Sequence, residues 1–267
     1  MDRSEADRRG LAEARRLRPD RLSVVHVAAA PRLLGDSRPG LERRLFHRRA
    51  RRRLEALVAD APGAEPVLLW GPAADRIVEW AREARPDLVV AASHAGRAER
   101  VLGSTARRLA TSAPCPALIL PPGVEPAAAP GEAPYAHIAC CIDDSPASMR
   151  ALAEARRLRA LGPGRLSLVH VGPRALIEAP AGDAGGGPRD LADDDRAWLA
   201  RVAEGVPGAE PVALTGLAAE AAIGWAREAG PDLMVAAAHR GPVERALLGS
   251  FAAHLARKAP CPALLTR

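Results

Sequence analysis

The stretch "GSTARRLATSAPCPALIL" at residues 103–120 returns near the C-terminus as "GSFAAHLARKAPCPALL" at residues 249–265. In both, a Gly-Ser pair precedes a helical span, and a cysteine flanked by prolines leads into a short apolar run. Upstream, residues 61–102 and 206–247 align without a gap and are identical at 26 of 42 positions. A repeat of this length indicates a duplicated domain.

Each copy alternates short apolar runs with amphipathic spans. In the second copy we expect strands at 137–142, 165–171, 210–214, 232–237 and 262–265, and helices at 147–161, 191–204, 218–229 and 243–258. This alternation predicts a parallel sheet with helices on both faces. The predicted fold class is therefore α/β, with two tandem doubly wound domains at residues 1–122 and 135–267. A Pro/Ala linker at 123–134 joins them, and residues 179–188 form a flexible insertion.

The first copy lacks the strand with which the second copy opens. "HIACCI" at 137–142 runs into Asp143 and Ser145, whereas the first copy starts directly at the matching Asp2 and Ser4. The first strand of a doubly wound sheet is commonly central. We favour a true start upstream of Met1, where an apolar segment like "HIACCI" would confirm it, over a genuine four-stranded copy. Without that segment, a neighbouring one must cover the gap, or the first copy is poorly stable.

The positive charge does not by itself indicate a nucleic-acid partner. The net charge is +6, and the densest basic run is Arg-rich, at residues 42–58. A helix there can solvate its arginines on one side and place apolar residues on the other: Leu41, Leu45, Leu54, Leu57 and Val58. RNA-binding sheets usually offer aromatic stacking platforms, and the chain has only two Phe and one Tyr. We therefore expect no nucleic-acid partner.

The chain shows no signal for a membrane or an oxidising compartment. It has no apolar run of about 18 residues, and its charged N-terminus lacks the apolar middle of a secretory signal. The four cysteines include no CxxC pair. We expect a cytoplasmic protein with no membrane partner, in which Cys115, Cys140, Cys141 and Cys261 are buried and unreactive.

Taken in this order, the motifs of both copies resemble the universal stress protein family. The second copy carries Asp143-Asp144-Ser145, "LVHV" ending at Val171, "GPDLMVAAAH" ending at His239, Gly249-Ser250 and "APCPALL". The first copy carries Asp2, "VVHV" ending at Val27, "RPDLVVAASH" ending at His94, Gly103-Ser104 and "APCPALIL". The resemblance implies the strand order 3-2-1-4-5 and final strands that pair across a two-fold axis. The two copies would then form a pseudo-dimer within one chain, and further homo-oligomers stay open.

The resemblance also implies a candidate site for ATP or another adenine nucleotide. Family members that bind ATP carry Gly-x-x-Gly, nine residues, then Gly-Ser or Gly-Thr. Glycines let backbone N–H groups approach phosphate, and a helix N-terminus with a hydroxyl completes the cradle. The matching candidates are Asp143, Val171, His239, Arg240, Gly241, Gly249 and Ser250 in the second copy, and Asp2, Val27, Gly96, Gly103 and Ser104 in the first.

The phosphate loop departs from the family pattern. Its first glycine aligns with Ala92 and Ala237, and its second with Ala95 and Arg240, or slips by one to Gly96 and Gly241. Six and seven residues then precede the Gly-Ser pairs instead of nine. Arg240 offers a charge-assisted phosphate contact in exchange. We expect weak or absent ATP affinity in the first copy and at best modest affinity in the second.

Structural roles compete with binding at the same residues. Asp143 with Ser145 forms an N-cap cluster in the reading we favour, and His94 and His239 fit turn positions. His26 and His170 alternate with valines and fit packing in strands. The glycines and serines of both Gly-Ser pairs fit tight turns into helices as well as they fit phosphate.

The sequence thus favours a stress-response binding protein that acts by nucleotide-sensitive or partner-sensitive association. The alternative is an interaction module of the same fold that binds no nucleotide. Neither a Ser-Gly-Gly-x-Asp-Ser loop nor a His-x-Gly-His signature occurs, so we expect no enzyme, no catalytic residue and no metal site.

Overall fold

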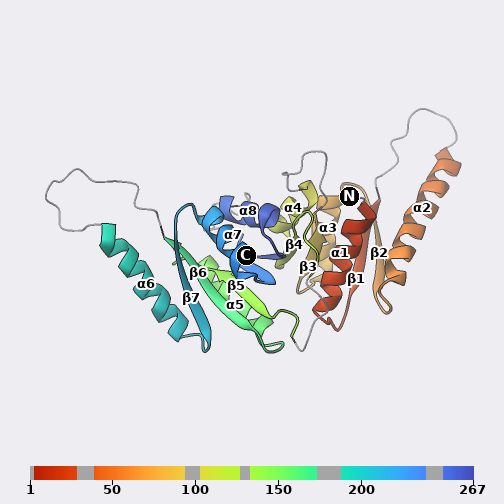
Figure 1. Cartoon of the computed structure of the whole chain (residues 1–267). Coiled ribbons are helices and arrows are strands. Elements are labelled where there is room, and N and C mark those ends of the chain that lie inside the picture. The colour runs from red at the N-terminus through yellow and green to blue at the C-terminus, as the bar shows by residue number, and fades with distance from the viewer. Residues whose placement is uncertain (1–2, 29–38, 94–102, 127–132, 173–187, 239–248) are drawn as a thin grey trace.

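The computed structural model describes residues 3–28, 39–93, 103–126, 133–172, 188–238 and 249–267 (Figure 1). The second copy comprises β5 (His137–Cys141), α5 (Pro146–Arg159), β6 (Arg165–Gly172), α6 (Pro188–Glu204), β7 (Ala209–Thr215), α7 (Ala218–Ala229), β8 (Leu233–Ala237), α8 (Ser250–Lys258) and β9 (Ala263–Thr266). Its strands run parallel in the order β7-β6-β5-β8-β9. The predicted order 3-2-1-4-5 is therefore confirmed.

Two bounds predicted for the second copy do not coincide with those of the described elements. The insertion was predicted to reach residue 188, but Pro188 is the first residue of α6, as suits a ring whose φ is already helical. The last helix was predicted from residue 243, and residues 243–248 lie outside the described ones.

The first copy has the same elements with one strand fewer. It comprises α1 (Arg3–Arg16), β1 (Ser23–Ala28), α2 (Pro39–Ala59), β2 (Glu65–Trp70), α3 (Ala73–Ala84), β3 (Val89–Ala92), α4 (Ser104–Ser112) and β4 (Ala117–Leu120). β1 and β2 form a parallel pair of their own, and β3 pairs with β4. In Figure 1 the β1–β2 pair lies on the far side of α1 from β3 and β4. The described residues place no strand between β1 and β3, which confirms that the first copy lacks its first strand.

The final strands of the two copies pair with each other. β4 lies antiparallel to β9, with Leu118 opposite Leu264 and Ile119 opposite Ala263. The pairing joins both copies in one seven-stranded sheet of order β3-β4-β9-β8-β5-β6-β7. Each copy thus covers the open sheet edge of the other.

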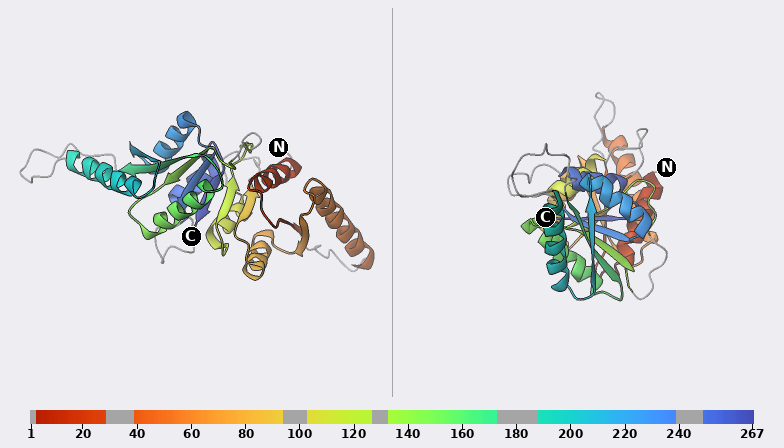
Figure 2. Two further views of the ribbon diagram at one scale, coloured as in Figure 1. Left: turned by 90° about the horizontal axis from the view of Figure 1, so that it is seen from below. Right: turned by 60° about the vertical axis from the view of Figure 1, so that its left-hand side comes forward.

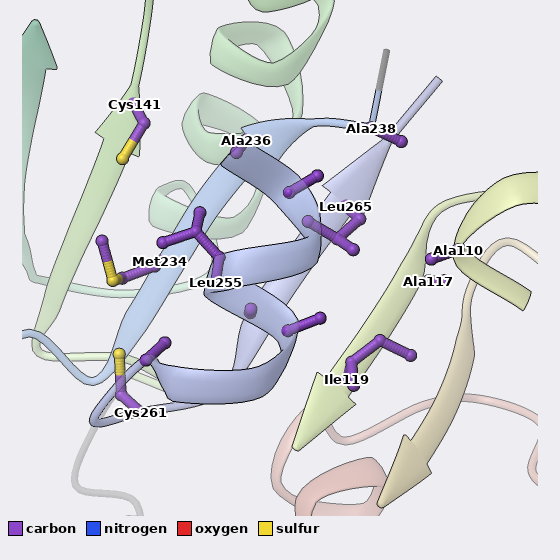
Figure 3. Close-up of a cluster of buried hydrophobic side chains, with 14 of the residues drawn as sticks. Ala110, Ala117, Ile119, Cys141, Met234, Ala236, Ala238, Leu255, Cys261 and Leu265 are labelled. Carbon is purple, nitrogen blue, oxygen red and sulfur yellow. The ribbon is translucent and has the colours of Figure 1, made fainter. Parts of the chain in front are cut away.

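Buried side chains fill both faces of this sheet, and each core continues across the β4–β9 junction. On one face, α4 and α8 pack on a cluster that includes Ile119, Met234, Leu255 and Leu265 (Figure 3). On the other face, α5 and α6 cover a cluster that includes Leu118 and Leu264 from the junction, with Leu17 at its margin. The two copies therefore share their hydrophobic cores.

The prediction for α2 is partly wrong. Leu54 is buried as expected and Leu57 and Val58 are half-buried, but Leu45 is 55% exposed. Phe46, which lies next to Leu45 and was not part of the predicted apolar side, is 47% exposed. A helix of 21 residues is about 31 Å long, whereas the six residues of β1 span about 20 Å. The first turns of α2 therefore extend past the strands (Figure 1). No described helix is both long and apolar enough to cross a membrane.

A carboxylate is buried where α1 meets the start of the second copy. Glu13 is fully buried, and the Tyr135 hydroxyl donates to its Oε1 at 2.6 Å. Arg16 Nη1 lies 3.9 Å from Glu13 Oε2, and the Arg16 guanidinium lies over the Tyr135 ring at 4.7 Å. Burial raises the pKa of Glu13, against the opposing effects of the Tyr135 bond and of Arg16.

Replacing Glu13 with glutamine is expected to stabilise the protein at pH 7. Because the folded-state pKa of Glu13 is raised, its contribution to stability is full below the unfolded pKa near 4.5 and is lost as pH rises through the folded value. Glutamine keeps an oxygen for Tyr135 and carries no charge. Urea unfolding should show a higher midpoint than the wild type at pH 7 and little difference at pH 4.

Glu154 provides the matched control, since "LAEARRL" at 11–17 and at 152–158 places Glu13 and Glu154 at aligned positions. Glu154 is 29% exposed and pairs with Arg157 at 2.9 Å, so Glu154→Gln should change stability little at either pH. A Glu13→Gln variant less stable at pH 7 than at pH 4, relative to wild type, would mean that Arg16 holds the charged form.

Candidate functional site

The candidate site of the second copy lies at the carboxyl edge of its sheet. β5 pairs in parallel with β6 on one side and β8 on the other, so the three strands end at the same edge, about 4.8 Å apart. Asp143 follows β5, and Val171 lies near the end of β6. Gly249 joins the same edge because its N–H donates to the carbonyl of Ala238, just after β8, at 3.0 Å.

Asp143 is part of the N-terminal cap of α5. Its Oδ1 accepts from the backbone N–H of Ser145 at 3.0 Å and from the Ser145 hydroxyl. Ser145 is the N-cap residue, and its Oγ accepts from the N–H of Ser148 at 3.2 Å. The Ser148 hydroxyl donates to the carbonyl of Asp143. These bonds fix the direction of a half-buried carboxylate, in agreement with the cap role favoured from the sequence.

Gly249 and Ser250 open α8 at this edge. Gly249 has an ordinary φ of −55°, so the turn does not need a glycine for its dihedral angle. A Cβ at this position would lie 3.2 Å from the carbonyl oxygen of Ala238, which makes the close approach to β8 the reason for glycine. Gly249 makes no side-chain cap, and Ser250 is exposed. Among the described residues, therefore, no N-cap side chain occupies the first amides of α8, which carry the partial positive charge of a helix N-terminus.

The end of β6 brings in a contact that the sequence did not predict. His170 Nδ1 donates to the carbonyl of Ile142 at 2.9 Å, which ties β6 to the end of β5. His170 Nε2 lies 3.6 Å from Asp195 of α6, and its ring contacts Trp198 edge-on at 5.0 Å. A Cβ on Gly172 would lie 2.5 Å from Asp195, so α6 approaches β6 closely. Only the acidic run at 193–195 hinted at this.

The same candidates are separated in the first copy. Val27 belongs to the β1–β2 pair, whereas Gly103 and Ser104 open α4, which packs beside β3 and β4 in the larger sheet. Between them the described residues supply no counterpart of β5. The arrangement that gathers Asp143, Val171 and Gly249 is therefore present in the second copy alone among the described residues.

A buried arginine occupies the carboxyl edge of the first copy. Arg9 of α1 is 3% exposed, and its guanidinium donates to the carbonyls of Ser93 at 3.1 Å, Pro121 at 3.3 Å and Val124 at 2.7 Å. In the second copy the carbonyl aligned with that of Ser93 belongs to Ala238 and accepts from Gly249. Arginine side chains are mostly exposed, and the sequence gave no sign that this one is buried.

Five candidates lie outside the described residues: Asp2, Gly96, His239, Arg240 and Gly241. His94 and Ala95 do so as well. The two domain ranges and the linker predicted from the sequence also stay predictions. Within the described ranges, no group of three or more His, Cys, Asp or Glu residues could hold a metal ion.

All four cysteines are free thiols whose surroundings favour the protonated form. Cys140, Cys141 and Cys261 are buried and Cys115 is half-buried. Burial raises the pKa of Cys115 to about 11 and that of Cys141 to about 12. A thiol with so high a pKa is a poor nucleophile at neutral pH, as expected. The prediction that all four cysteines are buried is wrong for Cys115, which is half-buried.

A family model identifies the family, and solved structures of low identity share the fold. The family model described as "Universal stress protein family" matches residues 2–121 and again 134–267. A universal stress protein from Archaeoglobus fulgidus DSM 4304 is 14% identical over 100% of this chain and 95% of its own, with a TM-score of 0.71. A protein of unknown function from Pseudomonas aeruginosa PAO1 is 12% identical over 91% of this chain and 82% of its own, with a TM-score of 0.56. No curated protein matches the chain.

Proposed function

Because the chain belongs to the universal stress protein family, we propose that it is a cytoplasmic stress-response regulator that binds an adenine nucleotide in its second copy. It acts by association with partners and carries out no turnover. One observation carries the proposal: Asp143, Val171 and the start of α8 meet at one edge of the second copy's sheet. Ligands of doubly wound sheets bind at this edge.

The residues at this edge fit the two ends of a nucleotide. The Asp143 carboxylate, oriented by its bonds to Ser145, suits ribose hydroxyls, and Val171 offers an apolar contact to the base. The first amides of α8 and the exposed Ser250 hydroxyl suit phosphate oxygens. Ala237, where the family loop has its first glycine, places a Cβ beside the phosphates, which is why we propose modest affinity.

The first copy is proposed to bind nucleotide weakly or not at all. Its Val27 and Ser104 lie in separate parts of the copy, and Arg9 already occupies the carbonyls at the end of β3 and after β4. Because phosphate oxygens accept hydrogen bonds, a phosphate could bind the buried Arg9 guanidinium only by displacing these three carbonyls.

Thermal-shift titration with ATP, ADP and AMP tests this ranking. A saturating nucleotide is expected to raise the melting temperature by about 2–4 °C, the shift that ~1 kcal/mol produces in a chain of this size. Asp143→Asn keeps an oxygen for the cap and removes the charge, so the shift should fall by at least half. Asp144→Asn is the control, since Asp144 is exposed next to it. A shift abolished by Asp2→Asn and kept in Asp143→Asn would place the site in the first copy.

The second candidate function is an interaction module that binds no nucleotide. The shortened loops and the alanines at positions 92 and 237 favour it. Mass spectrometry of small molecules released by denaturing freshly purified protein separates the two. Released adenine nucleotide supports the first, and its absence together with a flat thermal titration supports the second.

A further inference from the structure

The second helix of each copy lies at an outer end of the molecule, α2 in the first copy and α6 in the second (Figure 2). α2 packs on β1 and β2, and α6 packs on β6 and β7. Both helices carry exposed side chains on the face turned away from their strands. The two ends of the molecule therefore present equivalent helices to the surroundings.

Both helices hold the same register on their strands. The gap-free alignment of residues 61–102 with 206–247, continued upstream, matches Leu54 of α2 with Leu199 of α6. Leu54 is 4% exposed and Leu199 is 1% exposed. Residues that match on this alignment therefore lie at the same place on the two helices.

The outward positions of the two helices carry opposite charge. Arg48 and Arg49 of α2, the arginine pair, match Asp193 and Asp194 of α6, the aspartate pair. All four side chains are exposed. Within the described ranges Arg48, Arg49 and Asp194 form no ion pair, whereas Asp193 lies 3.0 Å from Arg196. Like charges repel, so an α2 face disfavours another α2 face and an α6 face disfavours another α6 face.

An antiparallel contact between α2 and α6 brings the opposite charges together. Two antiparallel helices that cross at these pairs place each arginine against an aspartate. Leu45 precedes the arginine pair by three residues, and Ala197 follows the aspartate pair by three, so these two also meet. Leu45 is 55% exposed, and Ala197 is exposed and small enough for a close approach. Residues three and four apart share a helix face, so Leu45 and the arginine pair form one surface.

From these observations we infer that the arginine pair of α2 binds the aspartate pair of α6 in a second copy of this chain, so that molecules associate head to tail. The contact joins two different faces, and each assembly keeps one face of each kind free at its ends. Such heterologous contacts build rings or filaments. Pairs of exposed charges are weak and are screened by salt, so the association is reversible. This inference does not depend on nucleotide binding.

The outer sheet edges do not favour a competing contact. β2 and β7 are the outermost strands of the two copies. Each begins with an exposed glutamate followed by an exposed proline: Glu65 and Pro66 in β2, and Glu210 and Pro211 in β7. Charged side chains and proline both discourage pairing between edge strands. The helices are therefore the surfaces through which the ends of two molecules meet.

Sedimentation velocity of the full chain over a range of protein concentrations tests the inference. In about 50 mM NaCl the sedimentation coefficient should rise with concentration, and about 500 mM NaCl should weaken the association about tenfold or more. Arg48→Asp with Arg49→Asp should abolish the rise, and so should Asp193→Arg with Asp194→Arg. A wild-type chain that stays monomeric at low salt overturns the inference.

Restoring the opposite charges separates this contact from a general effect of charge. An equal mixture of the two double variants should associate, because each supplies the face that fits the other. A chain that carries all four substitutions has the wild-type net charge with the two faces exchanged, and it should associate by itself. Failure of both to associate would overturn the inference.

A matched control changes the net charge elsewhere. Arg82→Asp with Arg107→Asp alters exposed positions on α3 and α4 and should leave the association unchanged. Loss of association in this control would mean that net charge alone drives it, against the inference. Nucleic acid that sediments with the protein, and whose digestion by nuclease ends the association, would assign the arginine pair to a nucleic-acid partner instead and also overturn it.

Discussion

Leu233→Ala is expected to lower the free energy of unfolding by about 3 kcal/mol, whereas the aligned Leu88→Ala costs about 1 kcal/mol or less. Leu233 of β8 is fully buried between β5 and β9. Truncating it removes apolar contacts and leaves a cavity that the neighbouring strands cannot close. Leu88 is only half-buried at the start of β3, the edge strand of the seven-stranded sheet, so water already reaches part of it. Urea unfolding of both variants measures the difference.

The pair controls for residue type, sequence context and helix partners, since "PDLVV" and "PDLMV" are aligned. Equal losses at the two positions would mean that Leu88 is as fully buried in solution as Leu233.

Leu118→Asp is expected to cost more than about 4 kcal/mol, since it places a carboxylate in an apolar core without a partner. Leu118 is 1% exposed, and it lies opposite Leu264, which is 2% exposed, across the β4–β9 pair. Both belong to the cluster beneath α5 and α6. Because that cluster spans the two copies, the substitution should loosen both, with faster hydrogen exchange in β9 as well as β4.

Leu161→Asp serves as the control for a leucine-to-aspartate change, because Leu161 is 48% exposed. It should alter stability by about 0.5 kcal/mol at most. Exchange in β9 that stays at the wild-type rate in Leu118→Asp would show that the β4–β9 pair does not hold the copies together.

Most of the fold could be predicted because the same order of apolar runs and amphipathic spans occurs twice in the chain. The repeat located the strands and helices, and the different beginnings of the two copies predicted that the first copy lacks one strand. The burial of a side chain in one copy could not be predicted from the aligned residue in the other copy. Glu13 and Glu154 belong to identical "LAEARRL" segments, yet one is fully buried against Tyr135 and the other is partly exposed. Their surroundings come from distant parts of the chain.

In the candidate site, too, local features could be predicted from the sequence and long-range contacts could not. The sequence placed Asp143, Val171 and Gly249 correctly at strand ends and a helix start, because these are local features. It could not foresee that Arg9 would bond to three carbonyls more than 80 residues away, or that Asp195 would face His170. Leu45 was misplaced because apolar spacing along a helix does not reveal where the sheet beneath it ends.

The β4–β9 pair also determines how the protein responds to dilution. When two separate chains meet through their last strands, the contact weakens as the concentration falls. Here both partners belong to one polypeptide, so each sees the other at a fixed effective concentration, of millimolar order for short flexible linkers. The contact therefore stays formed even when the protein is scarce in the cell.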